Sequence, residues 1–310
     1  MANKAVDAFF KEIPNVLIIV VLLLVLLVVL TKFNWVHCSQ VPGNWCKIYC
    51  DYVEQSHGKI ALVYGDNGLG DEQAFYQMMR SFRPNTYVER FHLNHTTSGL
   101  LNGFNAVVLM HAKEISSRQV QMIKDYVNRG GVLIVVGDSA SSHYVDDFDL
   151  ITARQKNASF FEQLLIENIT DGTPEYTDAI RQAKQTSWYR LLYNQSYVSG
   201  FDALEDVFSA KFVSVKNSPG IIEMRGVLRD NYVWNGLSAN ISFQTPAFAL
   251  ITPDSARVTE IALIKLNDNE FYPAIFESRY VGKIIYFAVP LEDIGSPALV
   301  NNLFDYLVVC

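Results

Sequence analysis

The chain has 310 residues, a formal net charge of −7 and four cysteines, and half of its residues are hydrophobic. The acidic balance and the absence of a Lys/Arg cluster argue against a general nucleic-acid binder, because phosphate recognition needs a basic surface. The length allows one large domain or two small ones in the roughly 250 residues that follow position 57.

An uninterrupted apolar run from Val16 to Leu30 lies close to the start of the chain. Ile13 to Thr31 extends it to roughly the 20 residues that a helix needs to cross a hydrocarbon core of about 30 Å. A cleaved signal peptide is the alternative, but its apolar part is usually about 7–15 residues and precedes a small-residue cleavage site. No such site follows Leu30, so the sequence predicts an uncleaved transmembrane helix at 13–31.

The flanking charges and the sequons predict the orientation. Lys4 and Lys11 precede the run and Lys32 follows it, which weakly favours a cytoplasmic amino terminus in a cell membrane or endomembrane. The rest of the chain is then extracytoplasmic. N-x-S/T sequons, expected as glycosylation sites there although each can arise by chance, occur at Asn94, Asn157, Asn168, Asn194 and Asn240.

The cysteines lie at the two ends of the expected soluble part: Cys38, Cys46, Cys50 and Cys310. An even count in an oxidising compartment predicts disulfides, with three possible connectivities, and we expect Cys310 to pair with one of the other three. Zinc is the alternative for the first three, although no C-x-x-C pair accompanies them. The predicted organisation is a short cytoplasmic segment at 1–12, the anchor at 13–31, a stalk at 32–57 and one extracytoplasmic domain at 58–310.

The first half of this domain alternates strands and helices. Apolar runs predict strands at 59–65, 86–91, 105–111 and 132–136. A helix capped by Asp71 follows the first strand, and one capped by Ser116 or Ser117 follows the third. This alternation predicts an α/β fold with a mostly parallel sheet covered on both faces.

The second half is less regular. Residues 158–210 are expected to be mostly helical or irregular, followed by strands at 211–215, 221–228, 247–251 and 260–265. A hairpin is predicted from strands 272–278 and 283–289 around Tyr280-Val281-Gly282, and Ser296-Pro297 begins a last helix.

Three segments carry a resemblance to a known superfamily: the strand N-A-V-V-L-M, the helix end N-R-G-G-V-L-I-V-V-G-D, and the late run Y-V-G-K-I-I-Y-F-A-V-P-L-E-D-I-G. Over residues 58–144 and 246–309 the chain resembles class I glutamine amidotransferase-like proteins. It is most similar to their non-catalytic or uncharacterised branches: the ThuA-like proteins, the DUF4350-type membrane proteins and the OST48-like domain of oligosaccharyltransferase. The resemblance implies a flavodoxin-like three-layer fold.

The residues that the superfamily uses for catalysis are missing. Amidotransferases place a Cys nucleophile on a G-x-C-x-G turn and a His-Glu pair late in the chain, whereas the matching turn here is Gly137-Asp138-Ser139-Ala140-Ser141 and no histidine follows His143. A Ser without a positioned base is a poor nucleophile. We therefore expect no amidotransferase chemistry, no cofactor and no metal.

A residual ligand site is expected at the carboxyl ends of the parallel strands. The residues predicted to arrive there are Asp66, Asn67, Gly68, His111, Asp138 and Ser139. The alternative interpretation is ordinary turn and capping chemistry at each of them.

Two functions follow from these patterns. The first is a non-catalytic interaction or scaffold subunit of a membrane or cell-envelope complex, for example an accessory subunit of glycosylation or transport machinery. Its partners would be the membrane and other membrane-protein subunits, and not nucleic acid. The second is a hydrolase or sugar-active enzyme that uses the strand-end Asp/His/Ser cluster; nucleophile and base within hydrogen-bond reach would favour it.

Overall fold

The computed structural model describes most of the chain, from the amino-terminal helix to the last helix. The described residues are 2–32, 36, 41, 45–49, 53, 58–84, 86–144, 147–184, 186, 189, 192, 198–201, 204–218, 220–267 and 270–307, with backbone alone at 2–15, 46, 47, 147–149, 198 and 199.

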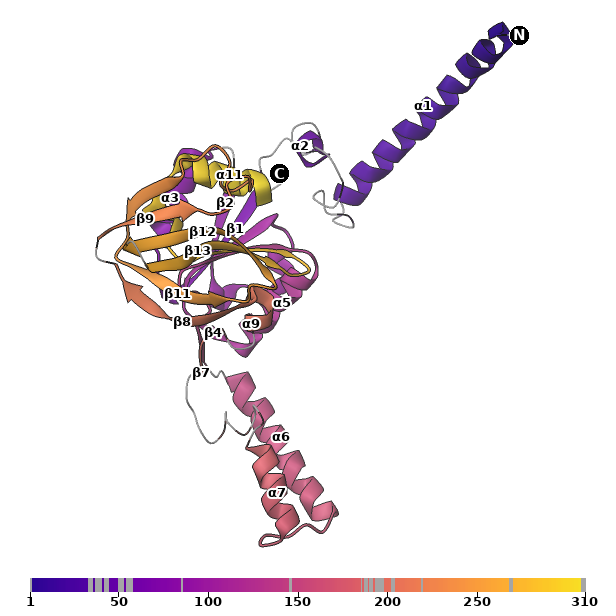
Figure 1. The fold of residues 1–310 in the computed structure, drawn as a ribbon. Helices are drawn as coiled ribbons and strands as arrows, with labels where there is room; N and C mark the ends of the chain where they lie inside the picture. Colours follow the sequence, from indigo (N-terminus) through magenta and orange to yellow (C-terminus); the bar gives the residue numbers. More distant parts are fainter. Residues whose placement is uncertain are drawn as a thin grey trace.

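A single helix, α1 (Ala2–Lys32), covers the predicted anchor and also the segment before it. Figure 1 shows it extending away from the rest of the molecule. Its side chains are described from Val16 onward, and those from Val16 to Leu26 are all exposed, by 48–62%. Among the residues described in this way, no helix is long and apolar enough to span a membrane.

Five parallel strands form one half of a nine-stranded sheet. They are β1 (Lys59–Asn67), β2 (Tyr87–His92), β3 (Ala106–Ala112), β5 (Val132–Val136) and β14 (Lys283–Phe287). Their spatial order is β2-β1-β3-β5-β14. Numbered by their appearance in the chain this is 2-1-3-4-5, the order of flavodoxin-like sheets, so this half confirms the predicted fold class.

The other half of the sheet is antiparallel. Beyond β14 follow, in spatial order, β13 (Glu270–Arg279), β12 (Val258–Asn267), β9 (Ile221–Gly226) and β10 (Asn240–Gln244). The predicted hairpin joins the halves, because β13 and β14 pair antiparallel while β14 pairs parallel with β5. The sheet as a whole is therefore mixed rather than mostly parallel.

Helices cover both faces of the parallel half. The crossovers through α3 (Glu72–Phe82) and α5 (Ser117–Asn128) run in opposite directions along the sheet, so right-handed connections place them on opposite faces. Asp71 caps α3 and Ser116 caps α5 in a capping box with Gln119, as the sequence predicts. The last helix, α11 (Pro297–Leu307), contacts α3, with Arg83 Nη1 2.7 Å from Asp305 Oδ1. These are the three predicted layers.

The remaining elements are short; all belong to this body except α2, which packs on α1. They are α2 (Trp45–Tyr49), η3 (Leu93–His95), α4 (Ser98–Leu101), α9 (Glu205–Phe208), α10 (Leu291–Ile294), a pair of strands β8 (Ala210–Asn217) and β11 (Ala247–Pro253), and a small sheet of β4 (Glu114–Ser116), β6 (Ser142–Tyr144) and β7 (Val198–Ser199).

A helical hairpin is inserted between β6 and β7. It consists of α6 (Asp147–Ile166) and α7 (Pro174–Ala183), which lie side by side and project from the sheet (Figure 1). The helical character predicted for 158–210 is thus confirmed in its first part, although the helix starts earlier, at Asp147. A cavity of about 680 Å³ lies between the two helices, lined by polar and apolar side chains together.

Candidate functional site

The predicted site residues do reach one edge of the sheet. Asp66 and Asn67 end β1, Gly68 follows them, His111 lies near the end of β3, and Asp138 and Ser139 follow β5. The β1–β3 pair is where the chain reverses its direction along the sheet, which is the usual ligand position in such folds.

The chain's own loop covers this edge. Leu69 N–H donates to Asp138 Oδ1 at 2.6 Å, and the Leu69 carbonyl accepts from His111 N–H at 3.2 Å. His111 Nδ1 donates to the Gly70 carbonyl at 2.6 Å, and the His111 backbone lies in the left-handed region with φ 50. A Cβ at Gly137 would lie 2.7 Å from Leu69 Cβ, so a glycine is needed for this close approach.

Ser139, at the position of the amidotransferase nucleophile, is fully buried. Its Oγ donates to the Val136 carbonyl at 2.7 Å, so its single hydroxyl proton is used inside the turn. Tyr286 O–H donates to the neighbouring Gly137 carbonyl, and burial raises the Tyr286 pKa well above its ordinary value. The turn is therefore a packed structural element in which Ser139 has no route to a substrate.

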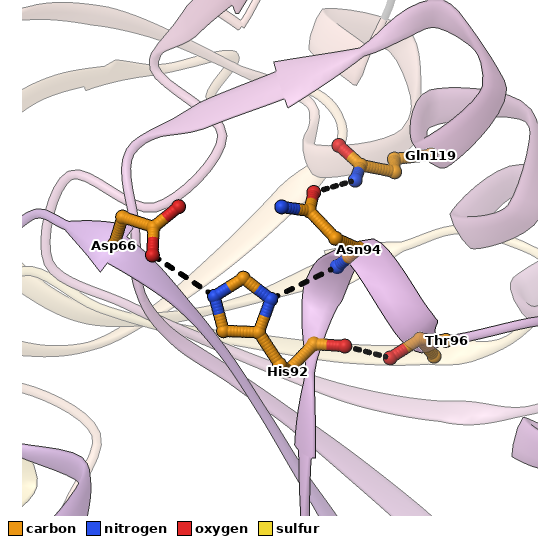
Figure 2. Close-up of polar contacts among 5 residues, drawn as sticks. All are labelled: Asp66, His92, Asn94, Thr96 and Gln119. Atoms are coloured by element: carbon orange, nitrogen blue, oxygen red, sulfur yellow. Dashed lines mark hydrogen bonds and ion pairs between the residues drawn. The ribbon is translucent and has the colours of Figure 1, made fainter.

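Asp66 is paired elsewhere, away from His111 and Ser139. Figure 2 shows His92 of β2 between Asp66 and the backbone of Asn94, with His92 Nε2 3.0 Å from Asp66 Oδ1. His92 Nδ1 accepts from Asn94 N–H at 3.3 Å, so in the neutral ring Nε2 carries the proton donated to Asp66. Asn94 Oδ1 in turn accepts from Gln119 Nε2 at 3.0 Å. This network joins β1, β2 and α5, and both ring nitrogens of His92 make hydrogen bonds within it.

Two carboxyl groups of α10, Glu292 and Asp293, were not predicted from the sequence. Glu292 of α10 accepts a hydrogen bond from Asp71 N–H at 2.5 Å through Oε1. Its Oε2 is buried and has no hydrogen-bond partner among the described residues. Burial raises the pKa of Glu292 to about 7, and burial also raises that of Asp293, which accepts from Thr245 Oγ1 at 2.7 Å. The P-L-E-D-I-G run contains both residues, but sequence alone does not tell which carboxylate is enclosed.

A second pair escaped sequence reasoning because its members lie far apart in the chain. Ser117 Oγ, in the first turn of α5, lies 2.9 Å from Nε2 of His143 on β6. The pairing of β4 with β6 brings them together, since Ile115 lies opposite His143. Both side chains are half-buried. A Ser–His contact of this length is compatible with a general base and favours an enzyme.

Within the described residues, no group of three or more His, Cys, Asp or Glu side chains is arranged to hold a metal ion. The side chains of all four cysteines lie outside the described residues, so the predicted disulfides stay a prediction. Of the sequons, Asn94, Asn168 and Asn240 are exposed, Asn157 is half-buried in α6, and Asn194 lies outside the described residues.

Ser139→Ala should leave any function of the protein intact. The change removes one buried hydrogen bond, which contributes about 1 kcal/mol to the free energy of unfolding, and touches no accessible group. Urea unfolding and a glutaminase assay on wild type and variant measure both effects. We expect no glutamine hydrolysis by either protein; loss of function by the variant with unchanged stability would restore a catalytic role for Ser139.

Comparison with known proteins gives structural matches only. No protein-family model matches the chain, and no curated protein sequence matches it. A ThuA-like protein from Bacteroides uniformis shares the fold with a TM-score of 0.52 at 11% identity, over 86% of this chain and 95% of that one. The cold-adapted β-galactosidase from Rahnella sp. R3 matches with a TM-score of 0.52 at 13% identity, over 81% of this chain and 31% of the enzyme.

At these identities the matches concern the fold alone. A GMP synthase component from Thermoplasma acidophilum is more distant, with a TM-score of 0.45 at 12% identity over 80% of this chain and 92% of that one. The ThuA-like match agrees with the resemblance that the sequence carries, and the chain shares the α/β fold of that protein.

Proposed function

We propose that the protein is a membrane-anchored, non-catalytic interaction subunit whose α/β domain lies outside the cytoplasm. The observation that carries this proposal is the covered strand-end site. Leu69 and Gly70 occupy the place where a substrate of this fold would bind, and Ser139 is enclosed beneath them. A fold that fills its own ligand site is suited to binding through its surface.

The anchor belongs to the same proposal. Residues Val16 to Leu26 expose apolar side chains on every face of α1, and helices that are apolar all round are found in protein cores or in bilayers. The sequence places no charged residue between Glu12 and Lys32. A bilayer is therefore the environment that suits this segment, with Ile13 to Thr31 as the span. The ThuA-like, DUF4350-type and OST48-like branches are the relatives that this proposal favours.

The full chain should resist extraction from its native membrane by alkaline carbonate. Each arginine at the centre of a span costs about 2.5–3.5 kcal/mol on insertion scales. Replacing both Leu22 and Leu23 by Arg should therefore release the protein, while replacing both by Ala should not. Extraction of the wild-type chain by carbonate would contradict the anchor.

The partner is best sought in the same membrane. Mild detergent solubilisation and affinity purification of the full chain should recover other membrane-protein subunits in fixed stoichiometry. Recovery of the chain alone at all detergent strengths would argue against a role as one component of a complex.

An extracytoplasmic domain of a eukaryotic cell should carry a glycan at Asn168. This residue is exposed at φ 56 in the turn after α6, where an acceptor asparagine is accessible. Asn168→Gln should raise electrophoretic mobility by one glycan, and Asn157→Gln, within α6 and half-buried, serves as the matched control. Unchanged mobility on glycosidase treatment of the wild type would contradict glycosylation.

A hydrolase is the second candidate, favoured by the Ser117–His143 contact rather than by the cluster predicted at the strand ends. A reactive Ser117 would be labelled by a fluorophosphonate, and Ser117→Ala would abolish the label. The interaction role predicts no labelling of either protein.

A further inference from the structure

The short helix α2 is fixed on the last turns of α1. Trp45 and Tyr49 lie one helical turn apart on α2, are only 8% and 5% exposed, and pack against Leu27 and Val28 of α1. Trp45 Nε1 donates to Thr31 Oγ1 at 3.2 Å, and Thr31 Oγ1 donates to the Leu27 carbonyl at 2.8 Å. These contacts hold α2 level with residues 27–31 of α1.

That level is defined relative to the apolar run. At about 1.5 Å per residue, Ile13 to Thr31 extends over about 28 Å, close to the thickness of a hydrocarbon core. Leu27 to Thr31 is the outermost portion, about 6 Å long. A helix fixed at this level cannot stand above the headgroups when α1 spans a bilayer; it must lie at the outer boundary of the hydrocarbon.

The side chains of this unit suit such a boundary. Water is scarce there, so an indole N–H needs an internal acceptor, and Thr31 supplies one that is itself buried. Ile48 of α2 is apolar and 48% exposed, and Lys32, the last residue of α1, is exposed and basic. Tryptophan and tyrosine are enriched at membrane interfaces, and lysine is favoured beside lipid phosphates.

We propose that α2 is a membrane-contact element, immersed at the outer boundary of the bilayer with Trp45 and Tyr49 fixed on α1 and Ile48 against acyl chains. This inference rests on the anchor role proposed above. Its partner is the lipid bilayer itself, and its effect is to hold the start of the stalk at the membrane surface.

The test uses the full chain in phosphatidylcholine vesicles. Subtracting the emission of Trp45→Phe from that of the wild type isolates Trp45 from the other tryptophans. Lipids brominated near the headgroup end of the acyl chain should quench this difference emission by roughly half or more, whereas aqueous iodide should leave it unchanged. Strong quenching by iodide, or none by brominated lipid, would overturn the immersion of α2.

The variant Thr31→Val tests whether the hydrogen bond from Trp45 holds α2 at this depth. The change keeps the shape but removes the acceptor of Trp45 N–H, so Trp45 should move outward and become accessible to iodide. Thr252→Val, at an exposed position of β11, is the matched control and should leave the quenching unchanged. If Thr31→Val does not change the quenching, the hydrogen bond does not hold α2 and the inference is wrong. Failure of the wild-type chain to float with the vesicles would instead refute the anchor itself.

Discussion

Reduction of the predicted disulfide between Cys310 and the stalk should lower the free energy of unfolding of the domain by about 4–5 kcal/mol. A bond from Cys310 to Cys38, Cys46 or Cys50 closes a loop of well over 200 residues, and in the chain-entropy model the unfolded state loses roughly that much freedom. Urea unfolding with and without reductant measures the difference, and non-reducing peptide mapping identifies the pair.

The topology supports this pairing. Helix α11 follows β14 and runs back along the sheet, so its end at Leu307 lies at the edge where β1 begins with Lys59. Contacts at that edge agree, because Arg83, directly after α3, binds Asp305 of α11, and Tyr87 N–H donates to the Gly58 carbonyl at 3.1 Å. Leu307 and Gly58, the described residues at the two ends of the domain, therefore lie on the same side of it.

Cys310→Ser is the specific variant for this prediction. It should reproduce the loss of stability caused by reductant and make the protein insensitive to it. Alkylation of the native protein without reduction is the control and should modify no cysteine. Four free thiols in freshly isolated protein would refute the disulfides and weaken the extracytoplasmic placement.

The parallel half of the sheet could be predicted because its signals are local. Continuous apolar runs such as the one at 132–136 mark strands buried on both faces, and Asp71 and Ser116 mark the helix starts with their capping chemistry. The extension beyond β14 could not be placed, because strand order there depends on which edge accepts the next hairpin. The sequence of β12 is compatible with a parallel or an antiparallel orientation. Its pairing with β13 and β9 makes it antiparallel.

The position of the site could be predicted from the sequence, but whether it is open to a ligand could not. Parallel topology brings Asp66, His111 and Asp138 to one edge whatever their side chains do. Whether that edge is open depends on Leu69, a residue without chemistry of its own, whose backbone reaches Asp138 and His111. The pairs Asp66–His92 and Ser117–His143 join residues 26 positions apart, and only the tertiary fold sets these contacts.

Glu292→Gln should stabilise the domain at pH 8 and remove a large part of its pH dependence. Burial raises the pKa of Glu292 to about 7, whereas an exposed glutamate in the unfolded chain titrates near 4.3. Below the unfolded value both states hold the proton and the domain keeps its full stability. Between that value and about pH 7 only the folded state holds it, so stability falls as pH rises.

The expected size follows from the width of this window. A difference of two to three pKa units corresponds to about 2–4 kcal/mol, lost progressively up to about pH 7 and constant above it. Gln keeps an oxygen to accept from Asp71 N–H but carries no charge to desolvate, so the variant should exceed the wild type at pH 8 by about 1–3 kcal/mol and equal it at low pH.

Urea unfolding of both proteins at intervals from pH 4 to pH 8 measures these curves. Glu162→Gln is the matched control, because Glu162 is an exposed glutamate on α6 and its removal should leave the slope unchanged. Parallel curves for wild type and Glu292→Gln would show that water reaches the carboxylate.

Ionisation of Glu292 should also affect the covered site, because Glu292 accepts a hydrogen bond from Asp71, which directly follows the loop that carries Leu69. Ionisation of Glu292 strengthens its hydrogen bond from Asp71 N–H but leaves a buried charge that the Asp71 and Asp293 carboxylates repel. Because the burial cost is the larger effect, the loop should exchange its amide protons faster at pH 8 than at pH 6, and equal exchange would mean that the loop is held by Asp138 and His111 alone.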